Sequence, residues 1–150
     1  MKERGTPAVI LLAEDDDDDY TLIRDALQEA RVLNPLLRVK DGVELLEYLR
    51  RQGAFADPEK APAPSLILID LNMPRKDGRT ALKEMKEDRS LRGLPVVVLT
   101  TSKSEEDVLA AYDIGASTFI RKPVTFEGLV EVARGLGRYW FEIVELPRTS

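Results

Sequence analysis

The chain has 150 residues, of which 43% are hydrophobic and 33% are charged, a balance typical of a globular domain. Its net charge of -5 argues against non-specific nucleic-acid binding, which relies on clustered Lys and Arg. It contains no Cys and no His, which excludes disulfides, thiolate nucleophiles, Cys/His zinc sites and histidine general bases. The sequence shows neither a signal peptide nor an apolar run of membrane-spanning length, so we expect a cytoplasmic protein without membrane contact.

The first half of the chain alternates apolar segments with segments of helical periodicity. Asn34-Pro35 ends the first helical segment, because the residue before a proline avoids the helical conformation. Six consecutive acidic residues, Glu14 to Asp19, run from the end of the strand before this helix into its first turn. The predicted elements are strands at about 8–13 and 36–39, helices at about 17–32 and from Asp41-Gly42 onward, and a proline-containing loop at 53–64.

The second half repeats this alternation, and its apolar strands end in polar side chains. One strand ends in the carboxylate of Asp70, and the next is followed by the hydroxyls of Thr100, Thr101 and Ser102. A further helix stops at Gly115. The predicted elements are strands at 65–70, 95–99 and 118–121, and helices at about 79–88, 104–114 and 126–140.

Five strands thus alternate with helices, and the central strands are apolar on both faces. This pattern predicts a parallel sheet with helices on both sides, a doubly wound α/β fold. We see no internal repeat and expect one domain over 1–150, with a core at about 8–138 and an extension at 139–150.

Chemically useful side chains follow four of the strands: Glu14 and Asp15, Asp70, Thr100, and Lys122. Because the carboxyl ends of parallel strands lie on one edge, we expect these side chains to converge. Crowded carboxylates suit Mg²⁺, and the lysine and the hydroxyl suit the oxygens of a phosphoryl group. The sequence therefore predicts a phosphoryl-transfer site.

Asp70 is the best candidate for the nucleophile, since it stands alone after a fully apolar strand. Carboxylates act as nucleophiles in aspartyl-phosphate chemistry. Because the chain lacks His, a phosphohistidine donor would belong to a partner.

These motifs resemble the receiver domain of two-component response regulators over about residues 8–138. The resemblance rests on five ordered elements: the acidic pair Glu14-Asp15, Asp70 within LILIDLNMPRKDG, Thr100 within VVVLTT, Gly115-Ala116-Ser117, and Lys122-Pro123. It implies a flavodoxin-like sheet of strand order 2-1-3-4-5. It also implies a switch that takes a phosphoryl group from a histidine kinase, with Mg²⁺ or Mn²⁺ as cofactor.

The resemblance further implies a role for each matching residue. Asp70 would accept the phosphoryl group, while Asp15, Asp70 and the Asn72 main-chain carbonyl would bind the metal, and Glu14 would act through metal-bound water. Lys122 and Thr100 would bind phosphoryl oxygens, and Thr100 with Phe119 would form the conformational switch. Asn72 and Ser102 would tune hydrolysis.

The proline-rich loop and the apolar tail after residue 138 resemble a stand-alone subgroup that includes response regulators paired with phytochromes and bacteriophytochromes. We therefore expect a sensor histidine kinase partner, in a bacteriophytochrome light pathway as a subgroup-level inference. We also expect a homodimer with the tail as an exchanged arm, and no direct nucleic-acid partner.

The sequence alone leaves other interpretations open. A haloacid-dehalogenase-like phosphatase would use a second Asp two residues after the nucleophile, where this chain has Asn72. A nucleotide or flavin binder lacks its glycine-rich loop. A receiver acting as a phosphate relay or sink, without an effector, is a further alternative. For Asp17 to Asp19, we expect a solvated run at a helix start, with Asp16 as N-cap.

Overall fold

The computed structural model describes residues 8–71, 73, 75–100 and 118–138, with only the backbone of Thr100 and Phe119. Within these residues, five parallel strands form one sheet of order β2-β1-β3-β4-β5. They are β1 (Ile10–Ala13), β2 (Leu36–Val39), β3 (Leu66–Ile69), β4 (Val96–Thr100) and β5 (Thr118–Arg121). The predicted fold class and strand order are confirmed.

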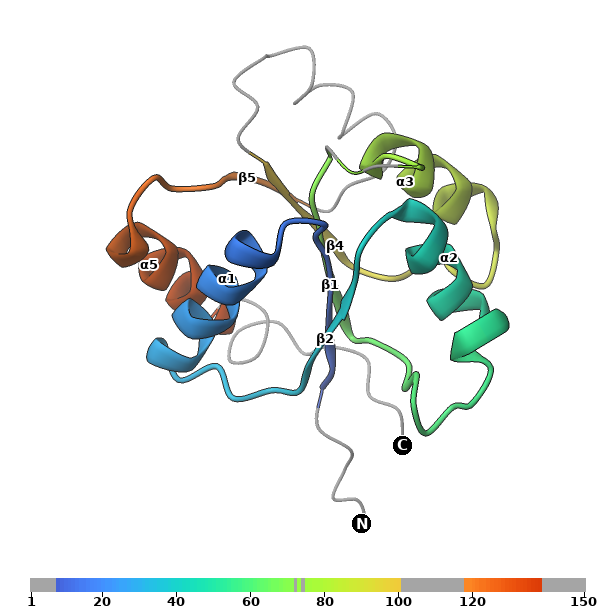
Figure 1. Ribbon diagram of the computed structural model, residues 1–150, viewed down its shortest axis with the longest axis horizontal. Helices are drawn as coiled ribbons and strands as arrows, with labels where there is room; N and C mark the ends of the chain where they lie inside the picture. The colour runs from blue at the N-terminus through green and yellow to red at the C-terminus, as the bar shows by residue number, and fades with distance from the viewer. Residues whose placement is uncertain (1–7, 72, 74, 101–117, 139–150) are drawn as a thin grey trace.

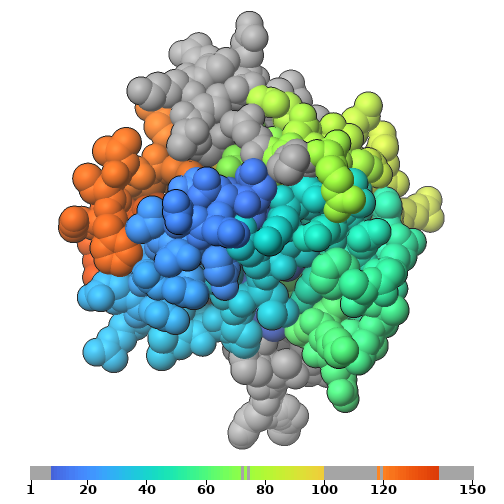
Figure 2. Space-filling model, in the orientation of Figure 1, coloured from blue at the N-terminus to red at the C-terminus, as the bar shows by residue number. Residues whose placement is uncertain are grey.

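Helices cover both faces of the sheet (Figure 1). One layer holds α1 (Asp17–Glu29) and α5 (Phe126–Gly137), and the other holds α2 (Gly42–Arg50) and α3 (Gly78–Glu87). In the space-filling view, α5 in orange lies directly beside the blue segment that contains α1 (Figure 2). The predicted helix at 104–114 lies outside the described residues.

Strand side chains alternate between two apolar clusters, one on each face. Leu11 and Ile67 pack in the cluster beneath α2 and α3, while Leu12 and Leu68 pack in the cluster beneath α1 and α5. Strands buried on both sides need apolar residues at every position, as in a parallel sheet covered by helices. This burial explains why the strands are continuous apolar runs in the sequence.

Each described α-helix is preceded by a residue whose side chain accepts a hydrogen bond from a backbone N–H three residues on. The four N-caps are Asp16, Asp41, Asp77 and Thr125. Such caps satisfy backbone N–H groups that lack a partner within the helix. The expected N-cap role of Asp16 is confirmed, with a distance of 2.9 Å to the backbone nitrogen of Asp19.

The first helix ends at Glu29, three residues before the predicted Val32. Arg31 adopts a left-handed backbone conformation with φ of 65°, and the N–H of Val32 donates back to the carbonyl of Leu27 at 2.9 Å. The chain thereby leaves the helix while Val32 stays buried in the core. Periodicity could not reveal this end, because Val32 is apolar inside and outside a helix.

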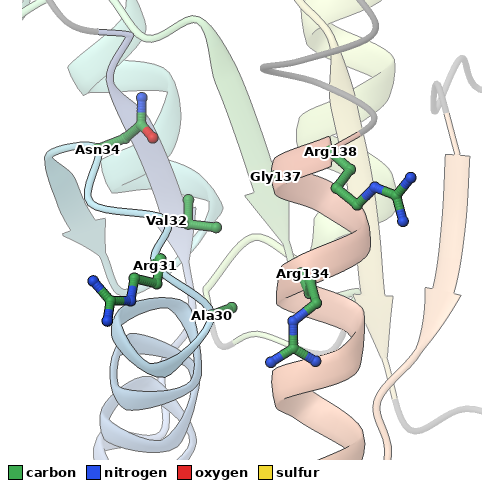
Figure 3. A pocket seen from close by; sticks show the side chains of 7 residues that line it. All are labelled: Ala30, Arg31, Val32, Asn34, Arg134, Gly137 and Arg138. Carbon is green, nitrogen blue, oxygen red and sulfur yellow. The ribbon is translucent and has the colours of Figure 1, made fainter.

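A pocket of about 190 Å³ lies between the C-terminal ends of α1 and α5 (Figure 3). Arg31, Arg134 and Arg138 border it, together with Asn34. It lies at the amino-end edge of the sheet, because α1 and α5 both start at the carboxyl-end edge. It is therefore remote from the predicted phosphoryl-transfer site.

No helix among the described residues combines the length and the apolar character needed to cross a membrane.

Candidate functional site

The ammonium group of Lys122, just after β5, lies among three carboxylates from three other segments. Its Nζ donates to Glu14 Oε1 at 2.5 Å, to Asp19 Oδ2 at 3.1 Å and to Asp70 Oδ2 at 3.2 Å. Only 8% of the lysine side chain is exposed. The structure thus brings Glu14, Asp70 and Lys122 together as the sequence predicts, and it adds Asp19.

The sheet ladder fixes the two carboxylates that follow β1 and β3. The backbone N–H of Glu14 donates to Val39 at 3.0 Å, and that of Asp70 donates to Ala13 at 3.1 Å. Both residues therefore continue the parallel hydrogen-bond pattern by one step beyond their strands. Their side chains are held at the edge by backbone that cannot easily shift.

Gly78, the first residue of α3, lets the chain return closely over Asp70. A Cβ at this position would lie 2.6 Å from the Asp70 carbonyl oxygen. The N–H of Gly78 donates to Leu71 at 3.0 Å. A larger residue would push α3 away from the segment that carries Asp70.

Burial dominates the electrostatics of Glu14, whose side chain is 1% exposed. Burial raises the pKa of Glu14 to about 7, although Lys122 lowers it. The pKa of Lys122 is also raised: burial would lower it, but Glu14, Asp70 and Asp19 together more than offset this effect. The ammonium therefore stays charged, and the site holds more negative than positive charge.

Glu14, Asp15 and Asp70 offer carboxylate oxygens that lie within 4.8 Å of one another. Asp15 is exposed, so solvent reaches this group from one side. Hard oxygen ligands with room for water are the donor set that Mg²⁺ and Mn²⁺ prefer. The residues present therefore fit a divalent cation.

The six acidic residues after β1 have separate roles. Asp16 caps α1, Asp17 pairs with Arg38 at 2.8 Å, and Asp18 is exposed. Asp19 was expected to be part of a solvated run, but it contacts Lys122. No sequence signal separates Asp19 from its neighbours, since only the direction of α1 decides which carboxylate faces β5.

Arg38, in β2, is a second residue that the sequence reasoning missed. Its Nε donates to the carbonyl of Glu14 at 2.9 Å, and its guanidinium lies 4.7 Å from the centre of the Tyr20 ring. The Asp17 contact completes a bridge from β2 to the start of α1. Arg38 thereby holds the loop that carries Glu14 and Asp15.

The remaining predicted residues are described in part or not at all. Thr100 ends β4 opposite Arg121, and Phe119 lies opposite Val98, so both occupy the expected strands. Their side chains, and Asn72 and Ser102 altogether, lie outside the described residues. The roles given to these four residues stay predictions.

Known proteins with similar sequences and folds identify the family of the chain. Residues 10–134 match the family model of the response regulator receiver domain. Response regulator Rcp1 of Synechocystis sp. is 39% identical over 145 residues, which cover 97% of each chain. The Mn²⁺-bound form of Rcp1 superposes with a TM-score of 0.84, at 39% identity over 94% of this chain and 99% of that one.

Two further solved structures share the fold and the length. The phosphorylated cyanobacterial phytochrome response regulator RcpA has a TM-score of 0.86, at 39% identity over 95% of this chain and 99% of that one. The response regulator RPA3017 in red light signaling of R. palustris has a TM-score of 0.89, at 36% identity over the same shares. With carboxylates and a lysine meeting where the sheet ends, the chain belongs to the response regulator receiver domains, the Mg²⁺- or Mn²⁺-binding phosphoacceptors of two-component signalling.

Proposed function

We propose that Asp70 accepts a phosphoryl group from a sensor histidine kinase in a reaction that depends on Mg²⁺ or Mn²⁺. The observation that carries this proposal is the 3.2 Å contact between Lys122 Nζ and Asp70 Oδ2, beside the carboxylates of Glu14 and Asp15. A cation bound there would neutralise charge on the transferred group. Lys122 would neutralise a second phosphoryl oxygen.

The chemistry is an in-line displacement. An oxygen of Asp70 forms a bond to phosphorus while the bond between phosphorus and the kinase histidine nitrogen breaks, and that nitrogen keeps the electron pair. The other ring nitrogen of the kinase histidine carries a proton, so the products are an acyl phosphate on Asp70 and a neutral histidine. Little covalent work falls to other groups, so positioning and charge dominate the rate.

Further roles follow as parts of the same proposal. The Asn72 main-chain carbonyl completes the metal ligands, and Thr100 hydrogen-bonds the bound phosphoryl group. Phe119 repacks in the switched state. Ser102 and the Asn72 side chain set the lifetime of the acyl phosphate.

We also propose the signalling pathway and the oligomeric state of the protein. The relatives named for phytochrome and red-light signalling support a light-sensing kinase as the phosphoryl donor. We propose one receiver domain over 1–150 that forms a homodimer through its C-terminal extension, contacts no nucleic acid directly, and does not turn over an external substrate. Light scattering on the chain ending at Arg138 tests the dimer, and an unchanged dimer mass refutes the role of the extension.

The central experiment is incubation with acetyl phosphate and Mg²⁺, followed by intact mass and peptide mapping. We expect one phosphate adduct on Asp70, its absence in Asp70→Asn, and its retention in Asp18→Asn, which removes an exposed carboxylate in the first turn of α1. An adduct on another residue contradicts the assignment. Rapid multiple turnover without an adduct favours a phosphatase.

A phosphotransfer assay separates the switch from a relay or sink. Phosphorylated histidine kinase is mixed with the chain, and the label on both proteins is followed over time. Net return of label from the chain to kinase or to a phosphotransfer protein supports a relay. A stable adduct with altered oligomeric mass supports the switch.

A further inference from the structure

Asp19 makes a contact with Lys122 that no predicted role explains. It lies in the first turn of α1, where its backbone N–H donates to the N-cap Asp16 at 2.9 Å. Its carboxylate then reaches Lys122 Nζ at 3.1 Å. We propose that Asp19 is a positioning residue that holds the Lys122 ammonium in place for the phosphoryl group. This inference rests on the function proposed above.

The hydrogen bonds of the Lys122 ammonium group show what Asp19 contributes. An ammonium group has three N–H donors, and Glu14, Asp19 and Asp70 accept one each. When Asp70 carries a phosphoryl group, one of these bonds must pass from Asp70 to a phosphoryl oxygen. The other two bonds then determine where the ammonium lies.

The two remaining carboxylates are not equivalent. Glu14 belongs with Asp15 and Asp70 to the group whose oxygens fit a divalent cation, whereas Asp19 lies outside that group. A cation bound at this group would therefore compete with Lys122 for the negative charge of Glu14 and Asp70. Asp19 takes no part in that group, so its 3.1 Å contact with Lys122 Nζ remains available to the ammonium when a cation is bound.

Asp19 is also anchored independently of the sheet edge. Its position is set by the N-cap of α1, and α1 packs against α5, the helix that follows Lys122. Its side chain is 42% exposed, so solvent weakens the ion pair. We therefore expect a severalfold effect on phosphoryl binding rather than its complete loss.

The test is binding of beryllofluoride, an acyl-phosphate mimic, to the full chain with saturating Mg²⁺, measured by isothermal titration calorimetry. Asp19→Asn is compared with Asp18→Asn, which removes the same charge one residue earlier but makes no contact with Lys122 in the described structure. We expect Asp19→Asn to raise the Kd roughly threefold to tenfold above that of Asp18→Asn, the loss typical of a partly exposed ionic hydrogen bond. We expect Asp19→Glu to recover most of the affinity.

A second readout separates positioning from a general structural defect. The ¹³Cε–¹H NMR signal of Lys122 should shift in Asp19→Asn and stay in place in Asp18→Asn, while both variants unfold at the same urea concentration. Equal beryllofluoride affinity in the two variants, or an unshifted Lys122 signal, overturns the role of Asp19 alone. Failure of the wild-type chain to bind beryllofluoride overturns both this inference and the proposed function.

Discussion

Glu14 and Asp41 follow the neighbouring strands β1 and β2, and both carboxylates are buried beside a cation. Glu14 shares the single ammonium of Lys122 with two other carboxylates. Asp41 binds the guanidinium of Arg75 through both of its oxygens, at 2.8 and 3.1 Å, and caps α2 as well. We call Lys122 with Glu14, Asp19 and Asp70 the lysine cluster. We call Asp41 with Arg75 the arginine clamp.

Their pKa values differ in direction for a physical reason. Burial raises the pKa of Glu14 to about 7, because one shared lysine does not offset it. Burial would also raise the pKa of Asp41, but Arg75 and the backbone N–H of Glu44 hold it below its usual value of 3.8. The arginine clamp is satisfied and joins two segments, whereas the lysine cluster keeps a surplus of negative charge that a cation can offset.

The largest effect should come from removing the ammonium. Lys122→Met leaves Glu14 buried with neighbouring carboxylates and, among the described residues, without a positive partner, so we expect a loss of about 3 kcal/mol in the free energy of unfolding in EDTA. Mg²⁺ should restore part of it, since a bound cation offsets the same charge. Urea denaturation with EDTA and with MgCl2 measures both values.

Lys76→Met is the matched control, because Lys76 pairs with Glu84 in a more exposed setting. It should cost less than about 1 kcal/mol and show no response to Mg²⁺. An identical loss for Lys122→Met with and without Mg²⁺ would contradict the idea that the lysine cluster is built to receive a cation.

The next effect concerns the close approach at the arginine clamp. Gly42 donates its N–H to Lys76 at 2.8 Å, and a Cβ on Gly42 would lie 2.4 Å from the same carbonyl oxygen. We expect Gly42→Ala to lower the free energy of unfolding by about 1–3 kcal/mol, with or without Mg²⁺. Gly135→Ala, where a Cβ meets nothing within 4 Å, should instead stabilise α5. Equal effects of the two substitutions in thermal unfolding would refute the steric argument.

Substitutions of Asp41 should lower the free energy of unfolding by a smaller amount. They separate its role as the N-cap of α2 from its ion pair with Arg75. Asp41→Asn keeps the cap of α2 and loses the charge, while Asp41→Ala loses both, so we expect costs below about 1 kcal/mol and about 1–2 kcal/mol respectively. Because the pKa is lowered in the folded protein, the ionised carboxylate stabilises the fold above about pH 3.8, and this contribution is lost as the pH falls through the lowered value. Acid unfolding of Asp41→Asn should therefore show a weaker pH dependence than that of the wild type.

The last effect is the pH dependence of cation binding. A proton on Glu14 competes with the cation, and with a pKa of about 7 the Mg²⁺ affinity should fall about tenfold between pH 8 and pH 6. The stability of the metal-free protein depends on pH in the opposite direction. Glu14 releases its proton at a higher pH in the folded state than in the unfolded state, so the free energy of unfolding declines as the pH rises from about 4.5 to 7.

Calorimetric titration with Mg²⁺ at several pH values measures the affinity. Glu14→Gln should flatten the profile, while Asp41→Asn should leave it unchanged. A profile for Glu14→Gln as steep as that of the wild type would assign the competing proton to another group.

The sequence reasoning succeeded where a local pattern carries the information. Apolar runs predicted the strands, and the polar residues after them predicted that Glu14, Asp70 and Lys122 share one edge, as the structure confirms. It failed at the end of α1, where the left-handed Arg31 closes the helix before Val32. It also missed Arg38 and Asp19, whose contacts depend on how α1 lies against β2 and β5.

By itself, then, the sequence determined the fold class and the residues that stand at the strand ends, because periodicity and burial act over a few neighbouring residues. Only the tertiary structure decided that Asp19 joins Glu14 at Lys122 and that Asp17 pairs with Arg38. Lys122 is separated from Asp19 by 103 positions, and no local rule relates residues so far apart. The direction of α1 across the sheet, fixed by its packing against α5, brings Asp19 to the ammonium and leaves Asp18 in solvent.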